Sequence, residues 1–429
     1  MAISVIVAIG TVARAEAIGG NKRVSSDEVA IGADANAVLA HHRYATLRWA
    51  PGTPALFAVA TRLSGHRSLR VGTHAHGPAQ YAQLAVELVT MLAATAIAWR
   101  LAGPLGGVLA AFLLAFYGPL ILVTRTYLSE PFGGLAMLAT FAVAAWARRR
   151  GLRALLLAGL VAGLAALVRE DLMPGIVLIA VALAAGRRRQ RGRRRAALEG
   201  LAYLLVAAAA IAPWAAYASS VDGRFVPITD GGVDSLFIGT YLPGGGTQPA
   251  VIRSFRHAVC VRLPRDCAGY DAESVGPMFR LIASRSPHLS FNSAIAHAVL
   301  ENLRRYALGH PAAFVAMLAR KLWDMWAFPW SGEGYARYNT SLLLHQIFVG
   351  LAWLGLLAGA LLIRSWSLVT VTLGLVAITL LNVLVNAQAR DNLRLLPLLF
   401  TFGAVGLVRS WPLLVERSRQ GKRLPCVGP

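Results

Sequence analysis

The residues ALLLAGLVAGLAALVREDLMPGIVLIAVALAAG at 154–186 decide the fold class of this chain. Two apolar runs are separated here by Arg169, Glu170 and Asp171. A single straight helix would bury these charges near the middle of an apolar layer, at about 2.5–3.5 kcal/mol for each Asp or Arg. Two helices with the charges at the connecting tip avoid this cost. The stretch therefore predicts a helical hairpin that crosses a membrane twice.

The composition of the whole chain agrees with a membrane protein. Hydrophobic residues make up 56% of the 429 residues, charged residues make up 14%, and the mean hydropathy is +0.56. These values exclude an ordinary soluble enzyme. A membrane-crossing helix needs about 20 apolar residues. Runs of suitable length lie at 84–103, 105–124, 130–147, 197–217, 342–363, 366–386 and 392–409.

The N-terminal run from Ile3 to Val12 is shorter and leads into Arg14 and Glu16. It is either a truncated first span or a signal sequence, so the role of residues 1–19 stays open. Counting this run and the hairpin, the sequence predicts an all-α polytopic membrane protein with about ten transmembrane helices and extracytoplasmic loops.

The basic residues predict how the chain is oriented. Lys and Arg number 42 against 20 Asp and Glu, for a net charge of +22. The run RRRQRGRRR at 187–195 follows the hairpin, and other short loops on the same side are rich in Arg, as cytoplasmic loops are. No nucleic-acid-binding motif accompanies the run. We therefore expect a multi-pass protein of the plasma (inner) membrane, with no nucleic acid as partner.

This layout divides the chain into three segments. Residues 1–217 form a predicted N-terminal transmembrane catalytic module, whose first outer loop is 20–83. Residues 218–341 form a predicted extracytoplasmic segment with a membrane-surface helix. Residues 342–429 form the C-terminal transmembrane helices and a short cytoplasmic tail.

The outer segment carries two local features. Cys260 and Cys267 are a candidate disulfide pair, because disulfides persist outside the cytoplasm; two free thiols are the alternative. The Gly-rich stretch GGVDSLFIGTYLPGGGTQPA at 231–250 lacks the pattern G-x-x-x-x-G-K-[ST], so it does not predict a nucleotide cradle.

Acidic residues and arginines gather in the loops that return to the outer side. Asp27 and Glu28 follow the first span, and Glu130 begins the span at 130–147. A carboxylate there can act as a general base or hold a divalent metal. Glu87, about a turn inside its span, is expected to be interfacial. Three arginines are candidates to hold a phosphate: Arg169, Arg390 and Arg394. For Arg390 and Arg394 the alternative is anchoring at lipid headgroups.

The order of several motifs resembles one family of membrane enzymes. The Asp-Glu pair is followed by APGTPALFAVATRLSG, TYLSEPF, GLVAGLAALVRED, AAIAPWAAY, HPAAFVAMLARKLWDMW and NAQARDNLRLLPLLF. This order resembles the GT-C superfamily of membrane glycosyltransferases, and within it the protein O-mannosyltransferases and aminoarabinose-lipid A transferases. The resemblance covers most of residues 25 to 409.

The resemblance implies an inverting transfer of a sugar from a polyprenyl-phosphate carrier to an extracytoplasmic acceptor (a protein hydroxyl, a glycolipid or a glycan), at a site open to membrane lipid. By this resemblance Asp27 looks like the catalytic base, Glu28 like its partner and Glu130 like the second acidic position. Arg390, Arg394 and Arg169 are the candidates for binding the donor phosphate. No cofactor is implied with certainty, and a divalent metal between Asp27 and Glu130 is left open.

Two other classes of function compete with this interpretation. A transporter or flippase for a lipid or small solute places ionisable residues near the middle of several spans. A non-catalytic scaffold does not need acids and arginines on one face. Because the acids of this chain collect at one rim of the predicted bundle, the sequence favours the glycosyltransferase.

Overall fold

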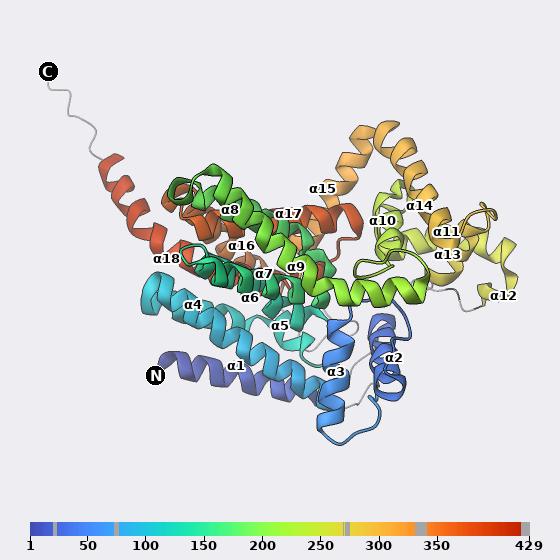
Figure 1. The fold of residues 1–429 in the computed structure, drawn as a ribbon, viewed down its shortest axis with the longest axis horizontal. Helices are drawn as coiled ribbons and strands as arrows, with labels where there is room; N and C mark the ends of the chain where they lie inside the picture. Colours follow the sequence, from blue (N-terminus) through green and yellow to red (C-terminus); the bar gives the residue numbers. More distant parts are fainter. Residues whose placement is uncertain (20–23, 73–76, 269, 271–274, 331–340, 422–429) are drawn as a thin grey trace.

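The computed structural model of the chain is built from helices (Figure 1). It describes residues 1–19, 24–72, 77–268, 270, 275–330 and 341–421, with the backbone alone for 417–421. These residues form no strand. The all-α class expected from the sequence is therefore confirmed.

Six helices in the described part of the chain are long and apolar enough to cross a membrane. The expected count of about ten is not confirmed. The helix α1 (Ala2–Ile18) and the helix α7 (Leu152–Val168) have 17 residues each, and α8 (Met173–Arg191) ends in an arginine-rich turn. The six are α4 (Pro78–Phe116), α6 (Glu130–Ala147), α9 (Arg193–Asp222), α16 with η5 (Leu342–Ala358, Gly359–Ile363), α17 (Trp366–Val385) and α18 (Leu396–Gly421).

Most of the segments predicted at 84–103 and 105–124 lie in one element, α4, that folds back on itself. Gly103 has a φ of 72° and precedes Pro104, so the helical path breaks there. Arg14 of α1 contacts Glu87 before the break and the carbonyl oxygen of Leu114 after it. A straight helix would hold residues 87 and 114 about 40 Å apart. The two halves of α4 therefore lie side by side, and α5 (Gly118–Val123) follows them.

The break predicted within 154–186 is confirmed. The helix α7 ends at Val168, a single turn η1 (Glu170–Leu172) follows, and α8 begins at once. Near the end of α8, Arg187 donates a hydrogen bond to the carbonyl oxygen of Arg150, which directly precedes α7. The chain thus returns to the side where α7 began, and the charged turn lies at the far end of the hairpin.

The remaining helices lie in the connections between these elements. Figure 1 shows α10 to α14 gathered at the end of the molecule away from both termini, where Cys260 and Cys267 form a disulfide. The bounds are α2 (Ser26–His41), α3 (Gly52–Leu63), α10 (Gly232–Thr240), η2 (Leu242–Gly244), α11 (Gln248–Arg262), α12 (Pro264–Cys267), α13 (Val275–Ala283), α14 (Phe291–Asn302), η3 (Leu303–Leu308), α15 (Pro311–Ala327) and η6 (Ala389–Asn392).

Small residues let α16 and α18 pack closely. A Cβ atom added at Gly355 would lie 2.2 Å from the carbonyl oxygen of Gly403, far inside van der Waals contact. Without a hydrophobic drive between helices in lipid, such close backbone packing is a main source of helix association. The contact therefore holds α18, which begins directly after η6, against the bundle.

A pair of glycine substitutions on α16 tests this packing. Gly355→Ala is expected to lower the free energy of unfolding by about 1–3 kcal/mol, because the added methyl group pushes α16 and α18 apart. Gly350→Ala is the matched control, since an added Cβ there meets no atom within 4 Å. Thermal unfolding in detergent measures both variants. Equal melting temperatures would contradict the close contact.

Candidate functional site

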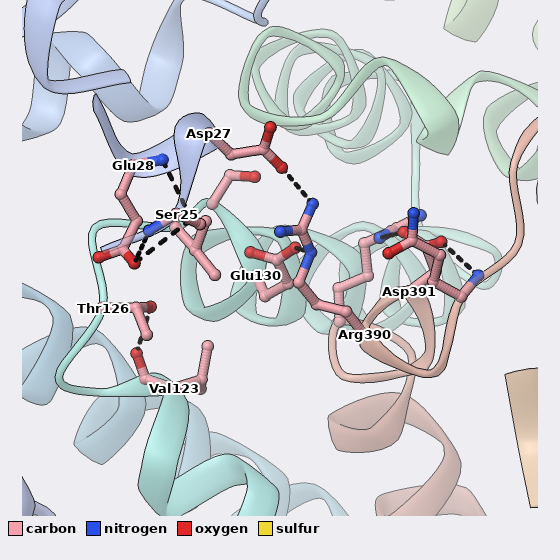
Figure 2. Close-up of polar contacts among 12 residues, drawn as sticks. Ser25, Asp27, Glu28, Val123, Thr126, Glu130, Arg390 and Asp391 are labelled. Carbon is pink, nitrogen blue, oxygen red and sulfur yellow. Dashed lines mark hydrogen bonds and ion pairs between the residues drawn. The ribbon is translucent and has the colours of Figure 1, made fainter. Parts of the chain in front are cut away.

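Arg390 joins two carboxylates that are far apart in the sequence (Figure 2). Its Nη2 lies 2.5 Å from Oδ2 of Asp27, a residue 363 positions away, and its Nε lies 3.2 Å from Oε1 of Glu130. The side chains of Asp27 and Arg390 are 25% and 19% exposed, whereas that of Glu130 is 2% exposed. The three residues form a charged cluster with one accessible edge.

The start of α2 positions Asp27. Ser25 is the N-cap of α2: its hydroxyl accepts from the backbone N–H of Glu28, and the Glu28 side chain accepts from the backbone N–H of Ser25. The other carboxylate oxygen of Glu28 accepts from the backbone N–H of Tyr127 at 2.9 Å. Glu28 therefore ties the first turn of α2 to the chain just before α6, and Asp27 in that turn points to Arg390 (Figure 2).

The start of α6 positions Glu130. The carboxylate lies in the first turn of α6, where the helix dipole favours negative charge. Its Oε2 is buried and has no hydrogen-bond partner among the described residues. The preceding residue, Ser129, accepts a hydrogen bond of 2.6 Å from Nη1 of Arg169. The start of α6 is thus also connected to the tip of the α7–α8 hairpin.

A second arginine, one turn after Arg390, lies in a denser network. Arg394 is 1% exposed, pairs with Asp171, and lies 2.9 Å from Oδ1 of Asp391. It also donates to Oδ1 of Asn382 at 2.7 Å. Arg169 approaches the same carboxylate of Asp171, at 3.4 Å. This network joins the hairpin tip to the segment that carries Arg390.

Charge balance fixes the protonation of these groups. Burial alone would raise the pKa of Asp171, but Arg169 and Arg394 outweigh it and lower this pKa to about 2. Burial opposes the charge of Arg390, yet Asp27 and Glu130 outweigh it and raise the pKa of the guanidinium. Asp171 and Arg390 are therefore ionised over the whole physiological pH range.

The structure brings the residues singled out from the sequence into one region, in three different roles. Asp27, Glu130 and Arg390 contact each other, Arg169 and Arg394 belong to the buried network, and Glu28 caps α2. Sequence reasoning missed the partners Ser25, Ser129, Asn382 and Asp391. The spacing S-x-x-E at 25–28 is the sequence signal of a capping box and identifies Ser25.

The two carboxylates do not fit a divalent cation in this arrangement, because the guanidinium of Arg390 already bridges them. The described residues contain no group of three or more His, Cys, Asp or Glu side chains that could hold a metal ion. The positive charge between Asp27 and Glu130 is supplied by the guanidinium of Arg390.

Glu87 differs from the expectation of an interfacial side chain. It is 6% exposed, its Oε2 lies 2.5 Å from Nε of Arg14, and Thr124 donates to the same oxygen at 2.8 Å. Burying a lone carboxylate in an apolar bundle is costly, and the nearby arginine offsets part of that cost. The partner was missed because it lies 73 positions away, in α1.

Comparison with known proteins shows the fold of the chain. No protein-family model matches the sequence, and no curated protein matches it. The archaeal oligosaccharyltransferase AglB from Archaeoglobus fulgidus, in complex with an inhibitory peptide and a dolichol-phosphate, is similar with a TM-score of 0.52 and 12% identity, over 100% of this chain and 52% of that chain. Its apo form gives a TM-score of 0.52 and 14% identity, over 98% and 52%.

ArnT from Cupriavidus metallidurans, in the apo state, gives a TM-score of 0.41 and 15% identity, over 100% of this chain and 81% of that chain. The chain spans about half the length of the oligosaccharyltransferase structures it matches. At this level of identity the likeness to the oligosaccharyltransferase establishes a shared fold.

The buried network makes a stability prediction. Asp171→Asn leaves Arg169 and Arg394 without their shared carboxylate and is expected to destabilise the protein by about 3–5 kcal/mol. Asp324→Asn is the control, because it removes only an exposed pair with Arg320, whose side chain is 83% exposed; it is expected to cost no more than about 1 kcal/mol. Thermal unfolding in detergent compares the two.

The ion pairs of Asp171 with Arg169 and Arg394 also predict that stability depends on pH. The pKa of Asp171 is lowered from 3.8 to about 2 in the folded protein, so its stabilisation is complete above the unfolded value and lost as the pH falls toward 2. The free energy of unfolding, measured between pH 6 and pH 2, should fall with pH in the wild type and fall less in Asp171→Asn. The same fall in stability in both proteins would contradict the ion pairing.

Proposed function

We propose that the chain is an inverting glycosyltransferase that moves a sugar from a polyprenyl-phosphate carrier to an extracytoplasmic hydroxyl acceptor. The observation that carries the proposal is the cluster of Asp27, Arg390 and Glu130 at the starts of α2, η6 and α6. The shared fold with an oligosaccharyltransferase, and the dolichol-phosphate in that structure, agree with a lipid-phosphate donor.

In the proposed reaction Asp27 acts as the general base. Its carboxylate takes the proton of the acceptor hydroxyl while that oxygen attacks C1 of the sugar from the face opposite the phosphate. The bond from C1 to the phosphate oxygen breaks, and its electrons leave with the polyprenyl phosphate. One glycosidic bond replaces one glycosyl phosphate bond. Because the attack comes from the face opposite the phosphate, the configuration at C1 inverts, and no nucleotide takes part.

Arg390 is the proposed phosphate ligand. A guanidinium has five N–H donors in a planar fork. Nη2 and Nε face Asp27 and Glu130, while Nη1 makes no hydrogen bond to the described residues. An arriving phosphate can accept from Nη1 and compete with Asp27 for Nη2. Binding of the donor would thereby free the carboxylate that must accept a proton.

The other candidates take positioning roles in the proposal. Arg394 is too deeply buried to meet a lipid phosphate, and its Nη1 and Nη2 are paired inside the protein. It holds the segment that carries Arg390. Arg169 supports the start of α6 through Ser129. Glu28 supports the first turn of α2. No step is routed through a metal ion.

A transporter for a lipid or small solute is the second candidate, because α1 and α4 share a buried ion pair. Arg14 and Glu87 lie between helices, as ionisable residues of a translocation path do. Arg14 is also held by the carbonyl oxygens of Gly10 and Leu114. A side chain fixed by this many partners is better suited to pinning the two halves of α4 than to moving a substrate.

The role of Asp27 is tested by sugar transfer. With purified protein, a hydroxyl acceptor and undecaprenyl-phosphate mannose or arabinose as donor, Asp27→Asn is expected to lower turnover at least about 100-fold, since the general base is lost. Glu301→Gln, at an exposed acid of α14, is the control and should keep wild-type turnover. Transfer by Asp27→Asn at the wild-type rate would rule out this base.

The role of Arg390 is tested by binding of undecaprenyl phosphate without a sugar. Arg390→Gln is expected to weaken binding at least about tenfold, because a charge-assisted contact to the phosphate is lost. Arg390→Lys keeps the positive charge but loses the planar set of N–H donors. Its affinity for undecaprenyl phosphate should lie between those of the wild type and Arg390→Gln. Arg364→Gln, at an arginine outside the cluster, is the control. Unchanged affinity in Arg390→Gln would exclude it as phosphate ligand.

A further inference from the structure

A small cavity with a mixed polar and apolar lining lies near the charged cluster. It has a volume of about 10 Å³, which is room for a single water molecule or hydroxyl group. It lies between α2, α3 and the tip of the α7–α8 hairpin. The polar side chains around it are Trp49, Thr53, Ser129, Arg169 and Glu170.

Two polar atoms on this cavity lack partners in the described structure. The hydroxyl of Thr53, a residue 1% exposed, and Nε1 of Trp49 are buried without a hydrogen bond. Leaving such a group unpaired costs about 1–3 kcal/mol. On the same helix the hydroxyl of Thr61 donates to the carbonyl oxygen of Phe57 at 2.7 Å. Thr53 is thus an exception that needs a reason.

The position of Thr53 in α3 explains why it has no partner within its helix. It is the second residue of α3, so no helical carbonyl lies one turn before it. The preceding Gly52 allows close packing, since a Cβ there would lie 2.9 Å from the carbonyl oxygen of Leu167 in α7. The start of α3 is therefore held against the end of α7, and the hydroxyl is held at the cavity beside Glu170.

The cavity adjoins the proposed reaction site on two sides. Ile31, which lines it, lies one helical turn after Asp27 on α2, and residues four apart share a helix face. Ser129, which also lines it, directly precedes Glu130. The cavity is thus lined by residues that neighbour Asp27 on α2 and Glu130 at the start of α6.

The chemistry of the lining selects a hydroxyl over a phosphate. Nε1 of Trp49 offers a donor, and the hydroxyl of Thr53 both donates and accepts. Glu170 adds an acceptor carboxyl, whose pKa is raised by burial in spite of the charge of Arg169. The charge of Arg169 is itself matched by Asp171. An alcohol, which donates one hydrogen and accepts others, meets this set, whereas a phosphate would face the carboxyl group of Glu170.

We infer that this cavity binds one hydroxyl group of the transferred sugar, with Trp49 and Thr53 as specificity-determining residues; the inference rests on the proposed glycosyltransferase function. The sugar hydroxyl accepts from Nε1 of Trp49 and exchanges a hydrogen bond with Thr53. The two orphaned groups are then satisfied only when a glycosylated donor is bound. A site of this kind rejects sugars that lack the hydroxyl, because its buried polar groups would stay unpaired.

The test separates sugar recognition from carrier recognition. Binding of undecaprenyl-phosphate mannose, undecaprenyl-phosphate arabinose and undecaprenyl phosphate alone is measured by calorimetry in lipid nanodiscs. The wild type should bind at least one sugar-bearing carrier more tightly than the bare carrier. Thr53→Val and Trp49→Phe should each lose about tenfold in affinity for that donor, by the worth of one buried hydrogen bond, with unchanged affinity for the bare carrier.

The melting temperature provides a second readout, because Thr53→Val should lower donor affinity without lowering stability. Thr53→Val removes an unpaired buried hydroxyl at nearly constant shape, so the ligand-free protein should melt at the same or a higher temperature. Thr53→Ser keeps the hydroxyl and should restore donor affinity. Thr61→Val is the matched control on α3, because it removes a hydroxyl that already has a partner in Phe57; it should leave donor affinity unchanged.

Two outcomes would overturn the inference. If Thr53→Val binds every donor as the wild type does, the cavity holds a structural water and no sugar group. If the wild type binds the bare carrier as tightly as the sugar-bearing carriers, no sugar pocket exists. A wild type that discriminates between them through Thr53 but transfers no sugar would support the hydroxyl pocket and count against the proposed glycosyltransferase reaction alone.

Discussion

The ion pairs of Arg390 with Asp27 and Glu130 are the interaction on which the arrangement of the site depends. A charge in an apolar bundle is tolerated only with a partner, and removing one partner leaves the other charge buried and costly. The three residues begin three different elements, so satisfying one guanidinium fixes the starts of α2 and α6 and the segment before α18 relative to one another. Local helix formation could not supply this long-range constraint.

Arg390 and Arg394 lie one turn apart but have different proposed roles. Arg390 faces the proposed phosphate site, and Arg394 supports the backbone that carries Arg390. Arg394 is 1% exposed, and its Nη1 and Nη2 are paired inside the protein with Asp171, Asp391 and Asn382. Arg390 is 19% exposed and, among the described residues, forms ion pairs with two carboxylates, those of Asp27 and Glu130. The deeper arginine holds the backbone rigid, and rigid support is what keeps a charged group at the position where a phosphate charge develops.

The sequence predicts the helical segments better than their number as membrane spans. The interruption at Arg169–Asp171 was predictable because three adjacent charges inside an apolar layer are costly, and a turn between two helices places them outside it. The count of spans was not, because α1 and α7 have only 17 residues, α8 ends in an arginine-rich turn, and most of two predicted spans lies in the single element α4. The sequence placed Arg390 near Asp27 only through the order of the loops, and it gave no sign that Arg14 pairs with Glu87. Periodicity indicates which face of a helix is apolar, but it does not indicate which distant helix supplies the opposite charge.

Capping explains why neighbouring acids in the sequence do not share one role. Asp27 and Glu28 are adjacent, but the S-x-x-E spacing from Ser25 turns Glu28 back onto its own helix end and onto the backbone of Tyr127. The next residue along a helix is rotated by about 100°, which leaves Asp27 facing Arg390. A residue is thus placed in the cluster by the cap beside it, and a change at Ser25 or Glu28 would move Asp27 without touching its chemistry. The position of the proposed base is therefore a property of the helix start rather than of the aspartate alone.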